Sequence, residues 1–140
     1  MTNVLNGNWT HRSFRNGDSS SGPVLAVPWA PDGALTVTTD PNGSVTGQLT
    51  FSLAGAVLSV TGQIHGPMAA GVAAPWPMPA SVELSAVTMN GTAEYRLRGW
   101  FIPNTNSVVG TVMAIKDDLA RQPDGTLGSW VLVEDQVPVS

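Results

Sequence analysis

A histidine near the start of the chain is the first side chain whose type and position could support chemistry. Residues 8–15 alternate, so that one face of a strand would carry Trp9, His11, Ser13 and Arg15 and the other Thr10, Arg12 and Phe14. The large indole of Trp9 favours the first set as the inward one, which would place His11 in an interior. An imidazole titrates near neutral pH, so His11 there would be a ligand contact or a general base. A hydrogen-bonded structural histidine is the alternative.

The most charged segment, residues 92–101, contains the second group of candidates. Its alternation puts Glu94, Arg96, Arg98 and Trp100 on one face and Tyr95, Leu97, Gly99 and Phe101 on the other. Only one face of a strand can point into a barrel. We favour a solvated charged face and an apolar inward face. In the alternative, a polar interior, Arg96 or Arg98 would bind an anionic or carbonyl group.

Other kinds of site have little support in the sequence. The chain has no Cys and only two histidines, His11 and His65, with no carboxylate at ligand spacing from either, so we expect no disulfide and no metal site. No Gly-x-Ser-x-Gly motif marks a serine nucleophile. The adjacent Asp117 and Asp118 are interpreted as the cap of one helical turn over 117–122 rather than as an acid–base pair. No cofactor is expected.

A long apolar loop, residues 65–80, is rich in proline. Loops of this length inside compact domains are uncommon and often functional. It would plug an open end of a barrel, cover a ligand cavity, or lie buried between subunits. In the second interpretation Pro75 and Pro77 stiffen the loop and hold Trp76 over the cavity mouth.

The elements that must position these residues are antiparallel strands. Residues 44–52 alternate without an error between polar side chains and apolar side chains or glycine, as in a half-buried strand. Asn-Gly and Asp-Gly pairs between such segments indicate type I′ hairpin turns. The predicted strands are 8–15, 24–29, 34–39, 44–52, 56–64, 81–88, 92–101, 107–115 and 127–134. The second and third merge into one if residues 30–33 only bend the chain, which leaves eight.

Such a meander has two unpaired edges unless it closes on itself. We therefore predict an all-β chain with one domain over residues 1–140, a single up-and-down antiparallel barrel of eight to nine strands. A barrel of about eight strands is filled by side chains or holds one small ligand. The predicted core contains Val45, Leu49, Phe51, Leu58, Val60, Val82 and Leu84.

The composition limits the partners. Charged residues make up 11% of the chain and the net charge is −4, whereas ordinary domains are about 25% charged. The lack of a basic patch argues against nucleic acid. So few charges on the surface favour a homodimer or larger homo-oligomer, in which copies cover part of it. No signal peptide or apolar run of membrane-spanning length is recognised, so we expect a cytoplasmic protein with no membrane association.

The opening of the predicted barrel resembles that of a known group. Gly7-Asn8-Trp9 resembles the Gly-x-Trp of calycin-like barrels, the avidins and lipocalins, and residues 31–36 resemble the second avidin hairpin. Residues 7–14 are also similar to small uncharacterised bacterial proteins that open Gly-x-Trp-Thr-Tyr-Arg-Ser-Phe. The avidin tryptophan pattern and the lipocalin disulfide are missing. The resemblance implies a calycin-like barrel with Trp9 turned toward its axis, and it implies no activity.

These features predict a small-molecule binding protein that holds a largely apolar or aromatic ligand in a barrel cavity walled by Trp9, His11 and Trp76. The alternative is a cofactor-free enzyme (a cyclase, isomerase or lyase) in the same cavity, with His11 or Glu94 as proton carrier and Arg98 as charge stabiliser. A filled barrel that only self-associates is the third interpretation. Ligand pockets usually reach several hundred Å³, so the size of the interior distinguishes the third from the others.

Overall fold

The computed structural model describes residues 5–16, 26–29, 33–51, 56–67, 78–119 and 124–135. These residues form strands and no helix, so none of them belongs to a helix that could cross a membrane. The strands are β1 (Gly7–Asn16), β2 (Ala26–Pro28), β3 (Gly33–Thr39), β4 (Ser44–Phe51), β5 (Val57–His65), β6 (Ser81–Thr88), β7 (Ala93–Phe101), β8 (Ser107–Asp117) and β9 (Leu127–Glu134).

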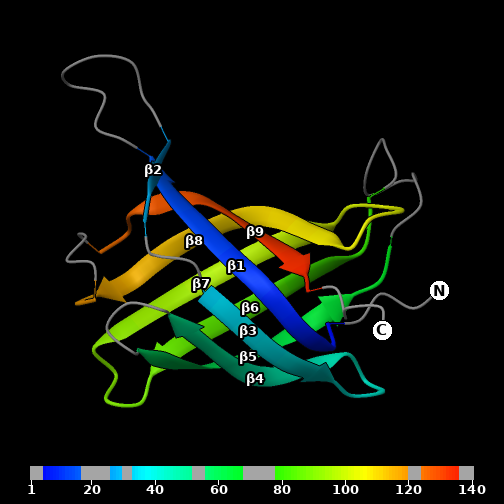
Figure 1. Ribbon diagram of the computed structural model, residues 1–140, viewed down its shortest axis with the longest axis horizontal. Coiled ribbons are helices and arrows are strands. Elements are labelled where there is room, and N and C mark those ends of the chain that lie inside the picture. Colours follow the sequence, from blue (N-terminus) through cyan, green and yellow to red (C-terminus); the bar gives the residue numbers. More distant parts are fainter. Residues whose placement is uncertain are drawn as a thin grey trace, which may run out of the picture.

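The strands close into an antiparallel barrel (Figure 1). From β3 to β9 each strand pairs with the next one along the chain, and β9 pairs with β1 from Trp9 to Arg15. One edge of β1 is occupied by β9. The other edge is shared by β3, which pairs with Gly7–His11, and β2, which pairs with Phe14–Asn16. The second and third predicted strands therefore occupy one position in the wall. The predicted fold class is confirmed as a closed eight-stranded up-and-down barrel.

The hairpin between β3 and β4 lies where the sequence predicts it, but its turn is of another type. Gly43 has a φ of 84°, whereas Asn42 is not among the residues with positive φ. A type I′ turn needs positive φ at both central residues, so that prediction is wrong here. Instead, Oδ1 of Asp40 accepts hydrogen bonds from the backbone nitrogens of Asn42 and Ser44, at 2.8 and 2.9 Å. The aspartate side chain stabilises the turn.

The inward faces of the strands form a continuous apolar core. All of the predicted core residues are buried, and Leu58 and Val82 are fully inaccessible. Inward-facing glycines allow the strands to bend and approach one another closely. A Cβ atom on Gly110 would lie 1.8 Å from the backbone oxygen of Arg98, so no larger residue fits there without moving the backbone.

Candidate functional site in the barrel interior

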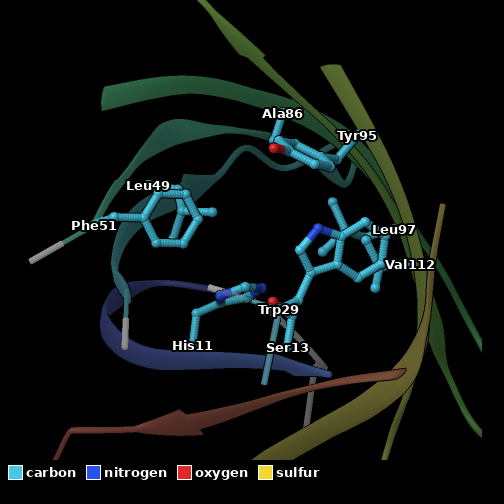
Figure 2. A pocket seen from close by; sticks show the side chains of 9 residues that line it. All are labelled: His11, Ser13, Trp29, Leu49, Phe51, Ala86, Tyr95, Leu97 and Val112. Atoms are coloured by element: carbon cyan, nitrogen blue, oxygen red, sulfur yellow. The ribbon is translucent and has the colours of Figure 1, made fainter. Parts of the chain in front are cut away.

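A small cavity lies in the interior, toward the end of the barrel where β1 ends. Its volume is about 30 Å³, which is room for a water molecule and not for a larger ligand. This is far below the several hundred Å³ of usual ligand pockets, so the described interior is that of a filled barrel, as in the third interpretation of the sequence. Figure 2 shows His11 and Ser13 pointing into it from β1, Leu49 and Phe51 from β4, and the Trp29 indole lying close to Leu97 and Val112. The complete lining is His11, Ser13, Trp29, Leu49, Phe51, Ala86, Tyr95, Leu97 and Val112.

His11 is the most unusual residue of this cavity. Its side chain is 4% exposed, and neither ring nitrogen has a hydrogen-bond partner within the described part of the chain. The imidazole instead stacks on Trp130, at 6.2 Å between centroids, and meets the edge of Phe51 at 6.1 Å. Burial away from water disfavours the charged form and lowers the pKa of His11 from 6.5 to about 4. The ring is therefore neutral at physiological pH, with one N–H donor and one free acceptor.

A hydrogen-bonded cluster of Asp117, Trp29 and Tyr95 lies beside the cavity. Asp117 is 3% exposed, and its Oδ2 accepts a hydrogen bond from Nε1 of Trp29 at 2.7 Å. Its Oδ1 accepts a hydrogen bond from the hydroxyl of Tyr95. The Trp29 and Tyr95 rings meet edge to face, with centroids 6.1 Å apart. Burial, and then the Asp117 carboxylate, raise the pKa of Tyr95 far above its usual value, so the phenol stays protonated.

A β-bulge turns Asp117 into the barrel. Glu94 of β7 lies opposite Lys116 of β8, and Tyr95 lies opposite Ala114, so Ile115 is an extra residue without a partner. Ala114 faces inward, and strict alternation would then turn Lys116 inward and Asp117 outward. The extra residue reverses this phase, which leaves Lys116 exposed and Asp117 buried. Bulges commonly re-aim a side chain next to a functional site.

This finding corrects the interpretation of Asp117 as a turn cap. Asp117 is the last residue of β8, and its carboxylate accepts hydrogen bonds from two side chains of the interior. Asp118 is exposed, so the pair is divided between the inside and the outside of the barrel. The part of the expected helical turn at residues 120–123 lies outside the described residues.

The charged face of β7 lies on the outside of the barrel, as we favoured from the sequence. Glu94 pairs with Arg96 at 2.7 Å, and Arg98 is exposed beside Glu83 at 3.7 Å. The guanidinium of Arg98 also lies over the ring of Trp100. Side chains alternate between the two faces of a strand, so Glu94 and Arg98 of β7 point out of the barrel, whereas His11 of β1 points into it. The proton-carrier role of Glu94 and the charge-stabilising role of Arg98 do not fit a site in this cavity.

Of the two tryptophans expected in the cavity wall, the structure describes Trp9 and not Trp76. Trp9 is buried, as predicted, but it lies in the core and does not line the cavity, and its Nε1 donates to the backbone oxygen of Asn6 at 3.1 Å. Trp76 lies outside the described residues. The strands that flank its loop end at His65 and begin at Ser81, on the side of the barrel where β1 begins. Of the predicted wall residues, the structure places His11 at the cavity.

The sequence does not predict Trp29, Tyr95 and Asp117 as members of one site. Its alternation predicts Tyr95 on the inward face of β7 as a core residue, but not as a partner of an aspartate. The described residues contain no group of three or more side chains that could bind a metal ion together. The polar groups at the site are the imidazole of His11, the phenol of Tyr95, the indole N–H of Trp29, the hydroxyl of Ser13 and the carboxylate of Asp117.

Comparisons of the chain with protein-family models, with curated proteins and with solved structures found no match. The class of protein is defined by the fold and the site together. It is a closed up-and-down β-barrel whose interior holds a buried neutral histidine next to an aspartate-centred hydrogen-bond cluster.

Proposed function

We propose that this protein binds a small uncharged molecule with an apolar body in the barrel interior, and that His11 anchors it. The observation that carries this proposal is that both ring nitrogens of His11, beside the cavity, have no hydrogen-bond partner among the described residues. Buried polar groups nearly always have hydrogen-bond partners, and leaving one without a partner costs about 1–3 kcal/mol. The cavity itself has room for a water molecule and not for a larger ligand, so a lining side chain must move before such a ligand reaches His11. The ligand would then recover this free energy when it binds.

The surroundings of His11 favour an uncharged ligand. Five of the lining residues, Leu49, Phe51, Ala86, Leu97 and Val112, are apolar, and a charged group would lose its hydration among them. A neutral imidazole offers one donor and one acceptor. The best fit is a molecule that is mostly apolar and has one or two groups able to hydrogen-bond.

A cofactor-free enzyme is the second candidate, because Tyr95 and Asp117 lie close to the same cavity as His11. His11 with a pKa of about 4 is a weak base at neutral pH, and general bases work best when their pKa lies near the operating pH. Binding is therefore the better supported function. Uptake of solvent deuterium at the α-carbon of acetophenone, present in the wild type and absent in His11→Phe, would support the enzyme instead.

Binding of phenol, measured by ligand-observed NMR, tests the proposed function. Phenol should bind the wild type and the Arg98→Ala variant equally, because Arg98 lies on the outer face. In His11→Phe the affinity should fall at least about tenfold, the equivalent of one lost hydrogen bond. Failure of phenol and other uncharged aromatic probes to bind, or equal binding in all three proteins, would contradict the proposal.

We also propose, from the low charge content, that the protein forms a homodimer or larger assembly. Exposed apolar side chains on the outer face of β8 and β9 support this: Val109, Leu127 and Val133. Val109 lines an outer groove that is also bordered by Phe14, Trp100 and Val131. A light-scattering mass equal to one chain, at micromolar concentration and physiological salt, would refute self-association.

A further inference from the structure

We infer that the Trp29 indole occupies the position of the ligand, and that the ligand is a planar aromatic molecule with a hydrogen-bond donor on its edge. On binding, it would displace Trp29 and donate to Asp117 in its place. This inference rests on the proposed binding function and specifies the chemical class of the ligand.

The contacts of Trp29 are those that a bound aromatic molecule would make. Its N–H donates to a buried carboxylate, its ring meets Tyr95 edge to face, and it lines the same cavity as Leu97 and Val112. None of these contacts requires the indole to be attached to the backbone. The barrel interior is therefore already complementary to a flat donor-bearing ring.

The strand that precedes Trp29 is the least paired strand of the sheet. Among the described residues, β2 has three residues and pairs with β1 alone, whereas every other strand pairs with at least two neighbours. One further backbone hydrogen bond, from Trp29 N to Ser13 O at 3.0 Å, continues this pairing. Segments with so few hydrogen bonds open at a low free-energy cost, so the indole can leave while the rest of the barrel stays folded.

An incoming ligand can compete with Trp29 because it can hydrogen-bond to His11, which has no such partner among the described residues. The indole donates to Asp117, but the nitrogens of His11 have no partner among the described residues. Displacement of the indole would join its space to the cavity of about 30 Å³ beside His11. The resulting space would be of the order of the 150 Å³ cavity that holds benzene in an engineered protein. A free ligand can then contact both Asp117 and His11.

The decisive measurement uses the wild-type protein with 5-fluorotryptophan in place of tryptophan, so that each indole gives its own ¹⁹F signal. The Trp29 signal is assigned by its absence in Trp29→Phe. Titration with indole should move this signal toward that of a solvent-exposed fluoroindole, in proportion to the bound fraction. Benzofuran has the same shape but lacks the N–H, and it should bind at least tenfold more weakly.

The Trp29→Ala variant gives a second, independent measurement. Because no side chain has to be displaced in this variant, indole should bind at least tenfold more tightly than to the wild type. Equal affinity in the two proteins would overturn the inference. If the variant does not fold, the ¹⁹F titration of the wild type decides alone.

The inference and the proposed function can fail separately. If phenol binds in a His11-dependent way while the Trp29 signal stays in place, or if benzofuran binds as well as indole, displacement by a donor-bearing ring is overturned and the proposed function stands. If neither phenol nor indole binds the wild type, both are overturned.

Discussion

The indole nitrogen of Trp29 donates a hydrogen bond to Oδ2 of Asp117 at 2.7 Å, although 88 residues separate them in the chain. The bond joins the end of β8 to the residue that follows β2, inside the barrel. Both partners are buried, and Tyr95 donates to the second oxygen of the same carboxylate. This cluster links the least paired strand to the wall of the barrel, and it sets the chemistry of the candidate site.

Replacement of Asp117 should destabilise the protein. In Asp117→Asn only one side-chain oxygen remains, so either Trp29 or Tyr95 loses its acceptor. We expect the free energy of unfolding to fall by about 1–3 kcal/mol in urea titrations. The neighbouring exposed Asp118 provides the control, and Asp118→Asn should stay within about 0.5 kcal/mol of the wild type. Equal effects of the two changes would mean that the carboxylate does not hold the cluster together.

Replacement of His11 by an apolar ring should stabilise the protein while it weakens ligand binding. Phenylalanine keeps the aromatic contacts with Trp130 and Phe51 and removes the two nitrogens that have no partner in the described residues. The expected gain in unfolding free energy is about 1–3 kcal/mol. A stability loss in chemical denaturation would show that the imidazole is already well satisfied.

Stability should depend on pH between about 4 and 6.5 through His11. Its pKa is 6.5 when exposed and about 4 in the folded protein, so the unfolded chain binds more protons in this range and stability falls as the pH is lowered. This pKa shift corresponds to a change of about 3 kcal/mol in the free energy of unfolding. The stability that the buried neutral His11 confers is fully present above pH 6.5 and is lost as the pH falls to about 4. Thermal or urea unfolding of wild type and His11→Phe across this range measures it, and parallel curves for the two proteins would refute it.

Two adjacent residues of β5 test the assignment of the inner face. Leu58 is fully buried and Val57 is 38% exposed. Leu58→Ala should cost about 2–5 kcal/mol through lost apolar burial and the cavity that remains. Val57→Ala should cost less than about 1 kcal/mol. A loss below about 0.5 kcal/mol for Leu58→Ala would place this side chain outside the core.

The close approach of β7 and β8 should make Gly110 intolerant of any side chain. A Cβ atom there would clash with the backbone of Arg98 and Gly99, whereas a Cβ on Gly66 would have no heavy atom of the described residues within 4 Å. We expect Gly110→Ala to lower stability by more than about 3 kcal/mol, at the severe end of single substitutions. Gly66→Ala should be nearly neutral in the same denaturation assay. A mild effect at Gly110 would mean that the strands can move apart easily.

Much of the barrel could be predicted because strand alternation is a local property of the backbone. Side chains of a strand point to alternate faces, so the pattern of residues 44–52 and the position of Trp9 relative to His11 predicted which side chains are buried. The sequence left open whether the second and third strands merge, and in the structure they are two strands that share one edge of β1. The type of the turn at Asn42-Gly43 was not predictable from this pair alone, because the side chain of Asp40 decided it.

The amino-acid sequence by itself determined the strands, their inward faces, the closed meander and the burial of His11, since each depends on periodicity and on the need to pair every strand edge. Only the tertiary structure decided which polar groups share the interior. Asp117 faces inward because Ile115 has no partner in the pairing of β8 with β7, and such a bulge depends on the register between two strands. Trp29 meets Asp117 because closure of the barrel brings together segments that are distant in the chain. Register and closure are long-range properties, and no local pattern of residues encodes them.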